Sequence, residues 1–447
     1  MDLIEAARKL IAIDSTPAQG NRRMVSCASE LCQSLGLHVE LQEETTGDLQ
    51  QANILVRPHE RRGDLELLLQ THLDTPDPGP FGAWAKTDYN PFDAHIIENR
   101  IYGLGAAGTK LDFLCKMLAM KAAGSDLRGM PPVLVGTFGE ESGMTGALKL
   151  IRKNKISSKL ALIGEPSNLQ LITAGKGFAS VEISVPFEED EKKFRIEHNL
   201  SEGTSTQSRL FHGKSAHSST PQRGESAIKK MFDYLLQLPE DLIIMEIDGG
   251  VNSTTVPAQA FLEVDPVSGC KLPMAKKLGL IYRAILDLEQ VFMQHQDARF
   301  TPAEPTLSIG LVRTSESEVV VAGNCRMPPT ISTEVYESWM QRLQKVCESV
   351  GGAFRVHDYK KPYQTDENSV FVRGAQDELR SMGLSEHLQT QSSTNEASLF
   401  SRVGIQCISF GPGAREDNIH TPNENVAVED LRRAIDFYTR MIKRFSA

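Results

Sequence analysis

A histidine and an aspartate closely follow an apolar run near residue 70. The run 65–69 is rich in leucine, and His72 and Asp74 come shortly after it. In a His-x-Asp segment both side chains lie on the same face of an extended chain, so the aspartate can orient the imidazole beside a metal ion. Incidental pairs of this kind are more common, so the interpretation depends on other residues that could share the site.

Two adjacent glutamates follow a second apolar run. Glu140 and Glu141 come after the run 132–138 and precede a glycine-rich turn. Adjacent residues at a strand end point in different directions, so one carboxylate can bind a metal ion while the other takes a proton as a general base. The alternative is an ordinary acidic start of a helix.

Two further candidates stand at comparable places. Glu165 follows the apolar run 160–164, and His420 follows the run 405–410 and a Gly-Pro-Gly turn. Two histidines together with glutamates form an oxygen and nitrogen ligand set of the kind that zinc prefers. The four places together therefore indicate a metal site.

Strands must carry these residues to a common edge. Apolar spacing predicts a helical region over 2–37 and a helix over 111–123, with strands near 38–41, 53–56, 65–69, 132–138 and 160–164. Strand alternating with helix is typical of an α/β sheet, and open sheets of this class place ligands at the carboxyl ends of their strands.

The pattern changes after residue 174. Residues 179–185 alternate strictly, as expected for a half-exposed strand, and the charged stretch 187–207 is interpreted as an exposed loop. The region also carries predicted helices at 226–238 and 333–350 and strands at 260–264 and 318–322, which suggests an α+β layer. From residue 363 the α/β pattern returns, with a helix at 368–383, a strand at 405–410 and a helix at 428–445. The predicted fold is an α/β domain, 1–173 and 362–447, with an inserted α+β domain, 174–361.

Composition narrows the class of protein. The 447 residues carry a formal charge of -10, which argues against a nucleic-acid or anionic-membrane partner. No uncharged apolar run approaches the roughly 20 residues that span a bilayer. No secretory signal is visible at the start, and the seven cysteines are scattered without paired spacing. We therefore expect reduced thiols and a cytoplasmic location.

Six blocks of the sequence, taken in order, resemble one family. They are His72-Leu73-Asp74, Tyr102-Gly103-Leu104-Gly105-Ala106, Glu140-Glu141, Glu165-Pro166, Ser215-Ala216-His217-Ser218-Ser219 and His420-Thr421-Pro422-Asn423-Glu424. The set resembles the co-catalytic zinc amidohydrolases, which include acetylornithine deacetylase, succinyl-diaminopimelate desuccinylase, aminoacylase and glutamate carboxypeptidase. The resemblance runs from about residue 65 to the C-terminus. It implies a zinc-binding α/β domain with an inserted lid or dimerisation domain, and a homodimer formed through that lid.

The resemblance also implies a metal ligand set. His72 and Glu165 would hold one zinc ion, and Glu141 and His420 the other. One or two zinc ions are expected, and cobalt or manganese could substitute.

Other positions take their expected roles from the same resemblance. Asp74 would orient His72, and Glu140 would be the general base. His217, in the lid, would reach into the active site of the partner subunit and stabilise the oxyanion, although by itself it could be a surface histidine beside a polar turn. Arg326 would clamp a substrate carboxylate, with an exposed structural arginine as the alternative.

One departure from the family pattern concerns the metals. The family block Gly-Arg-Gly-x-x-Asp-x-Lys supplies an aspartate that bridges two metal ions, and Gly108 stands at that position here. Asp112 is the nearest acidic residue. If Gly108 opens a helix, however, Asp112 lies about 6 Å farther along the axis, beyond the reach of a metal bond near 2 Å.

Two smaller departures concern substrate contacts. Thr254 stands where the family has an asparagine in the inserted domain, and Asn252 could take that role. Asn395 and Glu396 lie in a segment that resembles the deacetylase form of the family, and they are candidate substrate contacts.

These residues predict a metal-dependent hydrolase of the amide bond of N-acyl amino acids. Deacetylation of a substrate such as acetylornithine ranks first, desuccinylation second and peptidase action third. Because Gly108 replaces the bridging aspartate, a catalytically impaired relative that binds a ligand without turnover is the alternative from another class.

Overall fold

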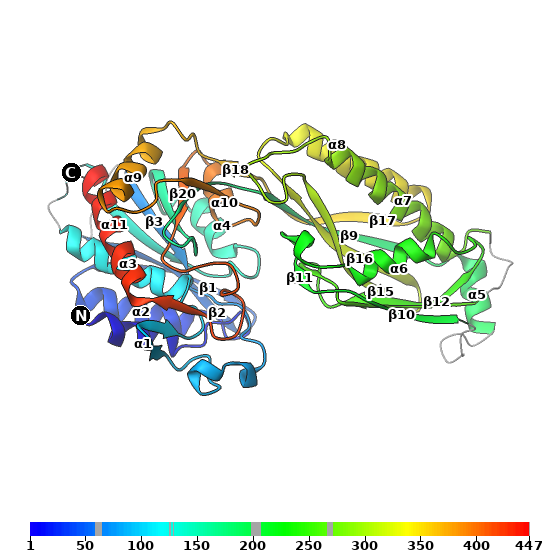
Figure 1. Ribbon diagram of the computed structural model, residues 1–447, viewed down its shortest axis with the longest axis horizontal. Helices are drawn as coiled ribbons and strands as arrows, with labels where there is room; N and C mark the ends of the chain where they lie inside the picture. Colours follow the sequence, from blue (N-terminus) through cyan, green and yellow to red (C-terminus); the bar gives the residue numbers. More distant parts are fainter. Residues whose placement is uncertain (59–64, 125–126, 128, 198–206, 266–270, 447) are drawn as a thin grey trace. The chain divides into compact units, whose positions relative to one another are not determined.

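The computed structural model describes residues 1–58, 65–124, 127, 129–197, 207–265 and 271–446. Its chain divides into two compact units, shown with their elements in Figure 1. The first comprises Met1–Ala174, Tyr363–Thr390 and Asn395–Ala447, and the second comprises Gly175–Pro362 and Gln391–Thr394. The predicted mixed α/β fold with an inserted α+β unit is confirmed.

A nine-stranded sheet runs through the first unit. Its order is β1-β2-β6-β3-β7-β20-β8-β18, and β19 pairs with β8. The strands are β1 (His38–Thr46), β2 (Leu49–Arg57), β3 (Glu66–His72), β6 (Pro132–Thr137), β7 (Ser158–Gly164), β8 (Leu171–Gly175), β18 (Tyr363–Gln364), β19 (Leu388–Gln391) and β20 (Gln406–Phe410). A separate small sheet joins β4 (His95–Ile97), β5 (Arg100–Tyr102) and β21 (Asn425–Ala427).

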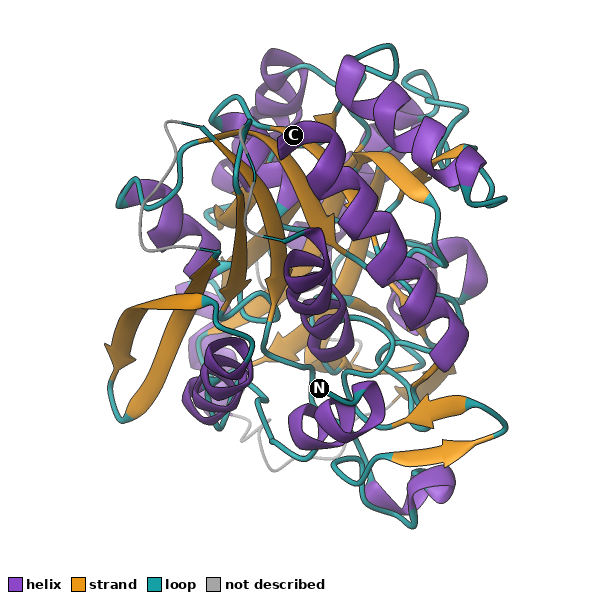
Figure 2. Cartoon of the chain, turned by 90° about the vertical axis from the view of Figure 1, so that its left-hand side faces the viewer, coloured by secondary structure: helices purple, strands orange, loops and turns teal. Residues whose placement is uncertain are grey.

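Alternate residues of the central strands enter two different cores. Leu67 and Leu69 of β3 belong to one core, while Leu68 between them belongs to the other. Because side chains alternate along a strand, the sheet is apolar on both faces and needs helices on each. Figure 2 looks onto this unit with its helices over the strands. The first core takes residues from α1 (Leu3–Ile11), α2 (Arg22–Ser34), α3 (Thr109–Ala123), α9 (Val370–Ser381) and α11 (Val428–Ser446), and the second from α4 (Thr145–Arg152) and α10 (Ala397–Arg402).

Four adjacent strands of this sheet are parallel. β6 pairs with β3, β3 with β7, and β7 with β20, all in the parallel sense. The register sets His72 beside Thr137 and Phe410 beside Gly164, so these strands end at one edge of the sheet. The chain segments that follow these ends carry the candidate residues of the predicted site.

The second unit is a seven-stranded antiparallel sheet with helices packed against it. Its order is β10-β14-β12-β15-β16-β9-β17. Inward residues of β9 alternate with half-buried ones, as the sequence predicted, and they share a core with α6, α7 and α8. The elements are β9 (Gly177–Pro186), α5 (Glu189–Glu197), β10 (Gln207–His212), β11 (Ala216–His217), α6 (Ala227–Leu235), β12 (Ile243–Gly250), β13 (Thr255–Val256), β14 (Gln259–Asp265), α7 (Met274–Phe292), β15 (Thr306–Thr314), β16 (Glu318–Met327), α8 (Thr333–Ser349) and β17 (Ala353–Lys360).

The helical region predicted over 2–37 is two helices. α1 ends at Ile11 and α2 begins at Arg22. Between them Pro17 disfavours a helical conformation at Thr16, and the Asp14 carboxylate accepts hydrogen bonds from the Thr16 amide and hydroxyl groups. These local bonds replace the helix that apolar spacing alone suggested.

The prediction of an exposed loop over 187–207 is wrong for its first half. Residues Glu189–Glu197 form α5, and its Glu191 is buried, where a carboxylate oxygen accepts the Met274 amide hydrogen bond at 3.0 Å. Residues 198–206 lie outside the described part of the chain. The run of charged residues therefore did not indicate an exposed loop, because one of its carboxylates caps the helix α7.

Two further observations concern the whole described chain. Within the described ranges, no helix combines the length and apolar character that crossing a membrane requires. The cysteines described there are free thiols: Cys27, Cys32, Cys115, Cys325, Cys347 and Cys407.

Candidate metal centre

His72 is the last residue of β3 and is held by the chain that follows it. Its Nδ1 atom lies 3.1 Å from the Asp74 carbonyl oxygen and 3.5 Å from the Asp74 Oδ1 atom. Asp74 is buried, so its carboxylate is a strong acceptor in a site of low polarity. The contact leaves the Nε2 atom of His72 as the nitrogen that can bind a metal ion.

Glu140 and Glu141 lie in the turn that follows β6. Gly139 begins this turn with φ +66°, and a Cβ atom there would meet the Thr145 hydroxyl oxygen at 2.3 Å, so only glycine fits. The Glu141 amide donates a hydrogen bond to Asp74 Oδ2 at 3.0 Å. This bond ties the glutamate turn to the residues after β3.

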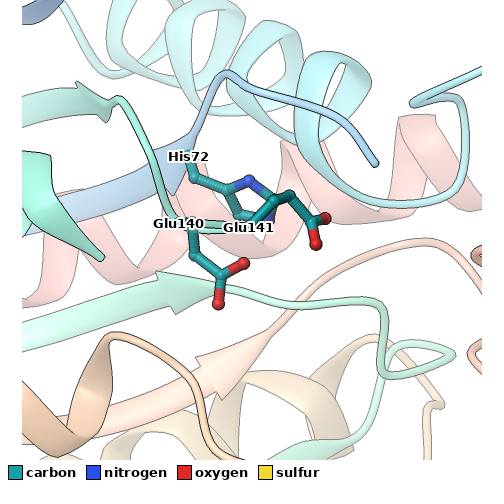
Figure 3. Close-up of side chains that lie close together, drawn as sticks. All are labelled: His72, Glu140 and Glu141. Carbon is teal, nitrogen blue, oxygen red and sulfur yellow. The ribbon is translucent and has the colours of Figure 1, made fainter. Parts of the chain in front are cut away.

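The three side chains His72, Glu140 and Glu141 form a compact donor set. One ligand atom from each lies within 4.8 Å of the others. Figure 3 shows the imidazole from the end of β3 beside the two carboxylates. One nitrogen and several carboxylate oxygens at this spacing suit a divalent metal ion such as zinc. The residues therefore fit the metal that the sequence predicted.

Burial and mutual repulsion perturb the ionisation of this cluster. Burial, with the charges of Asp74 and Glu165, raises the pKa of Glu140 to about 7. Burial and the neighbouring Glu140 raise the pKa of Glu141 well above its usual range. Although burial alone lowers it, the surrounding carboxylates raise the pKa of His72 well above its usual value. A cation among these groups would relieve the repulsion between the carboxylates.

His420 stands beside Glu141. Its Nε2 atom lies 3.7 Å from Glu141 Oε1, and its side chain is half exposed. The backbone of His420 has φ +57°, so a tight turn after Gly411–Gly413 turns the imidazole toward the carboxylate. The structure thus brings four predicted residues together: His72, Glu140, Glu141 and His420.

Glu165 follows β7 and is bound by another residue. Its Oε1 atom forms an ion pair with the Arg415 guanidinium, and its Oε2 atom lies 3.5 Å from the Asn395 amide nitrogen. Asn395 is buried and also donates to the Ser409 hydroxyl at 3.0 Å. Glu165 therefore lies at the predicted edge with its carboxylate oriented by an arginine and an asparagine.

Gly108 is the residue that precedes α3, as the sequence analysis assumed. A Cβ atom at this position would lie 3.2 Å from Cγ of Pro166, the residue that follows Glu165 in the chain. Asp112 does not replace the missing carboxylate, because it is buried and fully engaged. Its oxygens accept from the Thr71 hydroxyl, from Lys116 Nζ at 2.7 Å and from the Tyr438 hydroxyl at 2.5 Å.

Glu396 is the residue before α10, and its carboxylate contacts residues of β3 and β6. Its Oε2 atom accepts hydrogen bonds from the Thr137 hydroxyl at 2.9 Å and from the Gln70 amide. Burial, above all, raises the pKa of Glu396 to about 8 despite these bonds and the nearby His72. Glu396 is 2% exposed and its polar contacts are internal, so the structure gives no support for a direct substrate contact.

The remaining predicted residues belong to the second unit. His217 lies on β11, and its Nδ1 atom contacts the Ser219 hydroxyl at 2.7 Å. Asn252 Oδ1 accepts from the amide and hydroxyl groups of Thr254 at 3.0 and 3.1 Å, which closes a local turn. Arg326 on β16 is buried, with its guanidinium 4.5 Å from the Phe178 ring centre. This burial contradicts the alternative of an exposed structural arginine.

Arg415 is the site residue that the sequence analysis missed. It lies in the loop between Gly413 and His420, and its positive charge lowers the pKa of Glu140 against the larger effect of burial. A basic residue in a loop that leads to a candidate ligand was a usable signal. The sequence could not reveal its partner, because Glu165 is 250 residues away.

Comparison with known proteins identifies the class. The model of peptidase family M20/M25/M40 matches residues 68–444. The chain belongs to this peptidase family, which confirms the resemblance found in the sequence.

A curated relative refines the comparison. The acetylornithine deacetylase of Pectobacterium carotovorum subsp. carotovorum is 30% identical over 233 residues, which make up 52% of this chain and 52% of that protein. The chain thus spans about half the length of the curated relatives it matches.

Solved structures share the fold at low identity. An M20 family metallo-carboxypeptidase from Sulfolobus solfataricus has a TM-score of 0.63 and 18% identity, covering 100% of both chains. The Bacillus subtilis YXEP protein, a dinuclear metal binding peptidase of the family, has a TM-score of 0.52 and 10% identity, covering 99% of this chain and 97% of that one.

Proposed function

We propose that this chain hydrolyses the amide bond of N-acyl amino acids, with N-acetyl substrates of the acetylornithine type first. The observation that carries the proposal is the cluster of His72, Glu140 and Glu141 within 4.8 Å at the carboxyl edge of the sheet. Acetylornithine deacetylase relatives support the substrate class.

Zinc is the proposed metal, with cobalt or manganese as substitutes. His72, Glu141 and His420 would hold it. The sequence also predicted Glu165 as a ligand, and its carboxylate is paired with Arg415. When bound, the metal polarises the scissile carbonyl and makes water more acidic.

Glu140 is the proposed general base. Its carboxylate lies in the donor set with His72 and Glu141, where it could accept a proton from the attacking water and then release it. Glu140 would pass that proton to the nitrogen of the departing amine. Asp74 would keep the His72 imidazole in one orientation through the contacts at its Nδ1 side.

The second unit is proposed to contribute in two ways. His217 would donate a hydrogen bond to the oxygen of the tetrahedral intermediate, and Arg326 and Asn252 would contact the substrate. We also propose a homodimer through this unit. Its strand β10 is an edge strand with mostly exposed side chains, which another copy could cover. Analytical ultracentrifugation tests the dimer: a monomer at micromolar concentration contradicts it.

The experiment that tests the proposed activity measures release of free amine from N-acetyl, N-succinyl and dipeptide substrates. Metal-free protein is titrated with zinc, cobalt or manganese, and Glu140→Gln serves as the control for contaminating activity. We expect turnover of N-acetyl amino acids that requires metal and is lost with a chelator. Preferred turnover of N-succinyl substrates or dipeptides would select one of those alternatives. No turnover of any substrate while metal is bound would favour an impaired relative, with the carboxylate missing at Gly108 as the proposed reason.

A further inference from the structure

The Glu165 carboxylate is already neutralised by a residue of the chain. Its Oε1 atom forms the ion pair with Arg415, and Glu165 is only 8% exposed. The Arg415 side chain is 35% exposed, so the partner left poorly solvated when the pair breaks is the buried Glu165 carboxylate. A metal ion bound to Oε1 would have to displace Arg415, and one bound to Oε2 would bring a second positive charge to the same carboxylate.

The loop that carries Arg415 is anchored by its backbone. The Gly411 and Gly413 carbonyl groups accept hydrogen bonds from the amides of Leu169 and Asn168 at 3.0 and 2.8 Å. A Cβ atom on Gly413 would lie 1.8 Å from the Ala107 carbonyl oxygen, so the loop is packed tightly against the segment before Gly108. Arg415 follows this fixed turn by two residues.

The segments around Gly108, Glu165 and Arg415 thus meet at one place. Position 108 lies beside Pro166, the neighbour of Glu165, and contributes no carboxylate. Compared with a site that has aspartate at position 108 and no arginine, this site lacks one negative charge and has one additional positive charge. The resulting difference in net charge equals the charge of one divalent metal ion.

We propose that this chain holds a single metal ion, on the side of His72, Glu141 and His420, and that the Arg415 guanidinium takes the place of a second cation beside Glu165. The inference uses the metal site of the proposed function but is independent of turnover. It also distinguishes this chain from the dinuclear relative that shares its fold.

The test is the metal stoichiometry of the full chain. Metal-free protein is titrated with zinc, and free metal is then removed. The zinc content per chain is measured by inductively coupled plasma mass spectrometry. We expect one zinc ion per chain in the natural protein and two in the double variant Gly108→Asp/Arg415→Gln, which restores the carboxylate and removes the guanidinium. A Cβ atom at position 108 would lie 3.2 Å from Pro166 Cγ, so an aspartate there requires a small shift of the proline ring.

Arg432→Gln is the matched control. Arg432 lies on α11, is 64% exposed and pairs only loosely with Glu429 at 3.7 Å. This variant should bind one zinc ion like the natural protein. Two zinc ions or none in the natural protein, or one in a correctly folded double variant, would overturn the proposal.

Manganese spectroscopy keeps the proposal testable if the double variant does not fold. The natural protein loaded with manganese should give the paramagnetic resonance spectrum of isolated ions, and a spectrum of exchange-coupled pairs would overturn the proposal. Failure here is distinct from failure of the proposed activity. An inactive protein with one metal ion would contradict the proposed activity but not this inference. An active protein with two metal ions would contradict this inference but not the proposed activity.

Discussion

Asp74 joins the two halves of the metal cluster. One of its carboxylate oxygens accepts the Glu141 amide hydrogen bond at 3.0 Å, while the other lies 3.5 Å from His72 Nδ1. A single buried carboxylate therefore fixes both the imidazole after β3 and the glutamate turn after β6. Metal affinity should depend on this residue although it is not itself a proposed ligand.

Asp74→Asn should weaken metal binding by about 10-fold to 100-fold, which is the usual effect of losing the partner of a ligating histidine. Calorimetric titration with zinc measures the change. Asp77→Asn is the control, since Asp77 is exposed and only accepts the Gly79 amide hydrogen bond at 2.7 Å. Equal affinities of the two variants would show that Asp74 does not position His72.

Glu140 and Glu141 should respond differently to the same substitution. Glu140→Gln should lower turnover by roughly 10²-fold to 10⁴-fold while metal remains bound, because it removes the proton acceptor only. Glu141→Gln should lose metal as well, since it removes a proposed ligand. Activity and metal content are measured on the same samples. Metal loss in Glu140→Gln would reassign that residue as a ligand, which its place in the donor set allows.

The buried network around Asp112 should be important for stability. The Tyr438 hydroxyl lies 2.5 Å from Asp112 Oδ1, and removing it in Tyr438→Phe leaves a buried carboxylate with one donor fewer. We expect a loss of about 1–3 kcal/mol in the free energy of unfolding, measured by urea denaturation. Tyr89→Phe, at a residue that is 61% exposed, should change it by less than about 0.5 kcal/mol. No difference between the variants contradicts a supporting role for the network.

The stability of the metal-free protein should fall as pH rises from about 5 to 8. Burial raises the pKa of Glu396 from its ordinary value of 4.5 to about 8, so between these values the folded chain holds a proton that the unfolded chain has released. Stability then decreases with rising pH, because the folded state binds more protons. Melting temperatures of the natural protein and Glu396→Gln across this range provide the measurement. The variant should show a flatter profile, and parallel profiles would contradict the prediction.

Local patterns predicted the regular elements of the fold well. The alternation in β9 and the apolar runs of β3, β6 and β7 each reflect burial on the faces of a sheet, which sequence spacing reports directly. The helix α5 was missed because its charges suggested solvent, whereas Glu191 caps another helix. Such a contact depends on the packed chain and has no local signature.

The candidate site was only partly accessible from sequence. His72, Glu140, Glu141 and His420 each follow a predicted strand, so a parallel sheet brings them together. The partners of Glu165 and Asp112 come from distant segments, and no periodicity relates Glu165 to Arg415. Helix geometry argued against Asp112 as a replacement for the carboxylate missing at Gly108, and in the structure its oxygens are bonded to Thr71, Lys116 and Tyr438.

The place where the chain leaves the first unit has a further consequence. The second unit begins after Ala174 at the end of β8 and returns at Tyr363 in β18, and these strands are neighbours, with the Thr365 amide bonded to the Thr173 carbonyl oxygen at 2.8 Å. A short turn could make the same connection. The segment Gly175–Pro362 therefore stands where a hairpin loop would, and the chain could lose or exchange this segment without changing the order of any strand in the nine-stranded sheet.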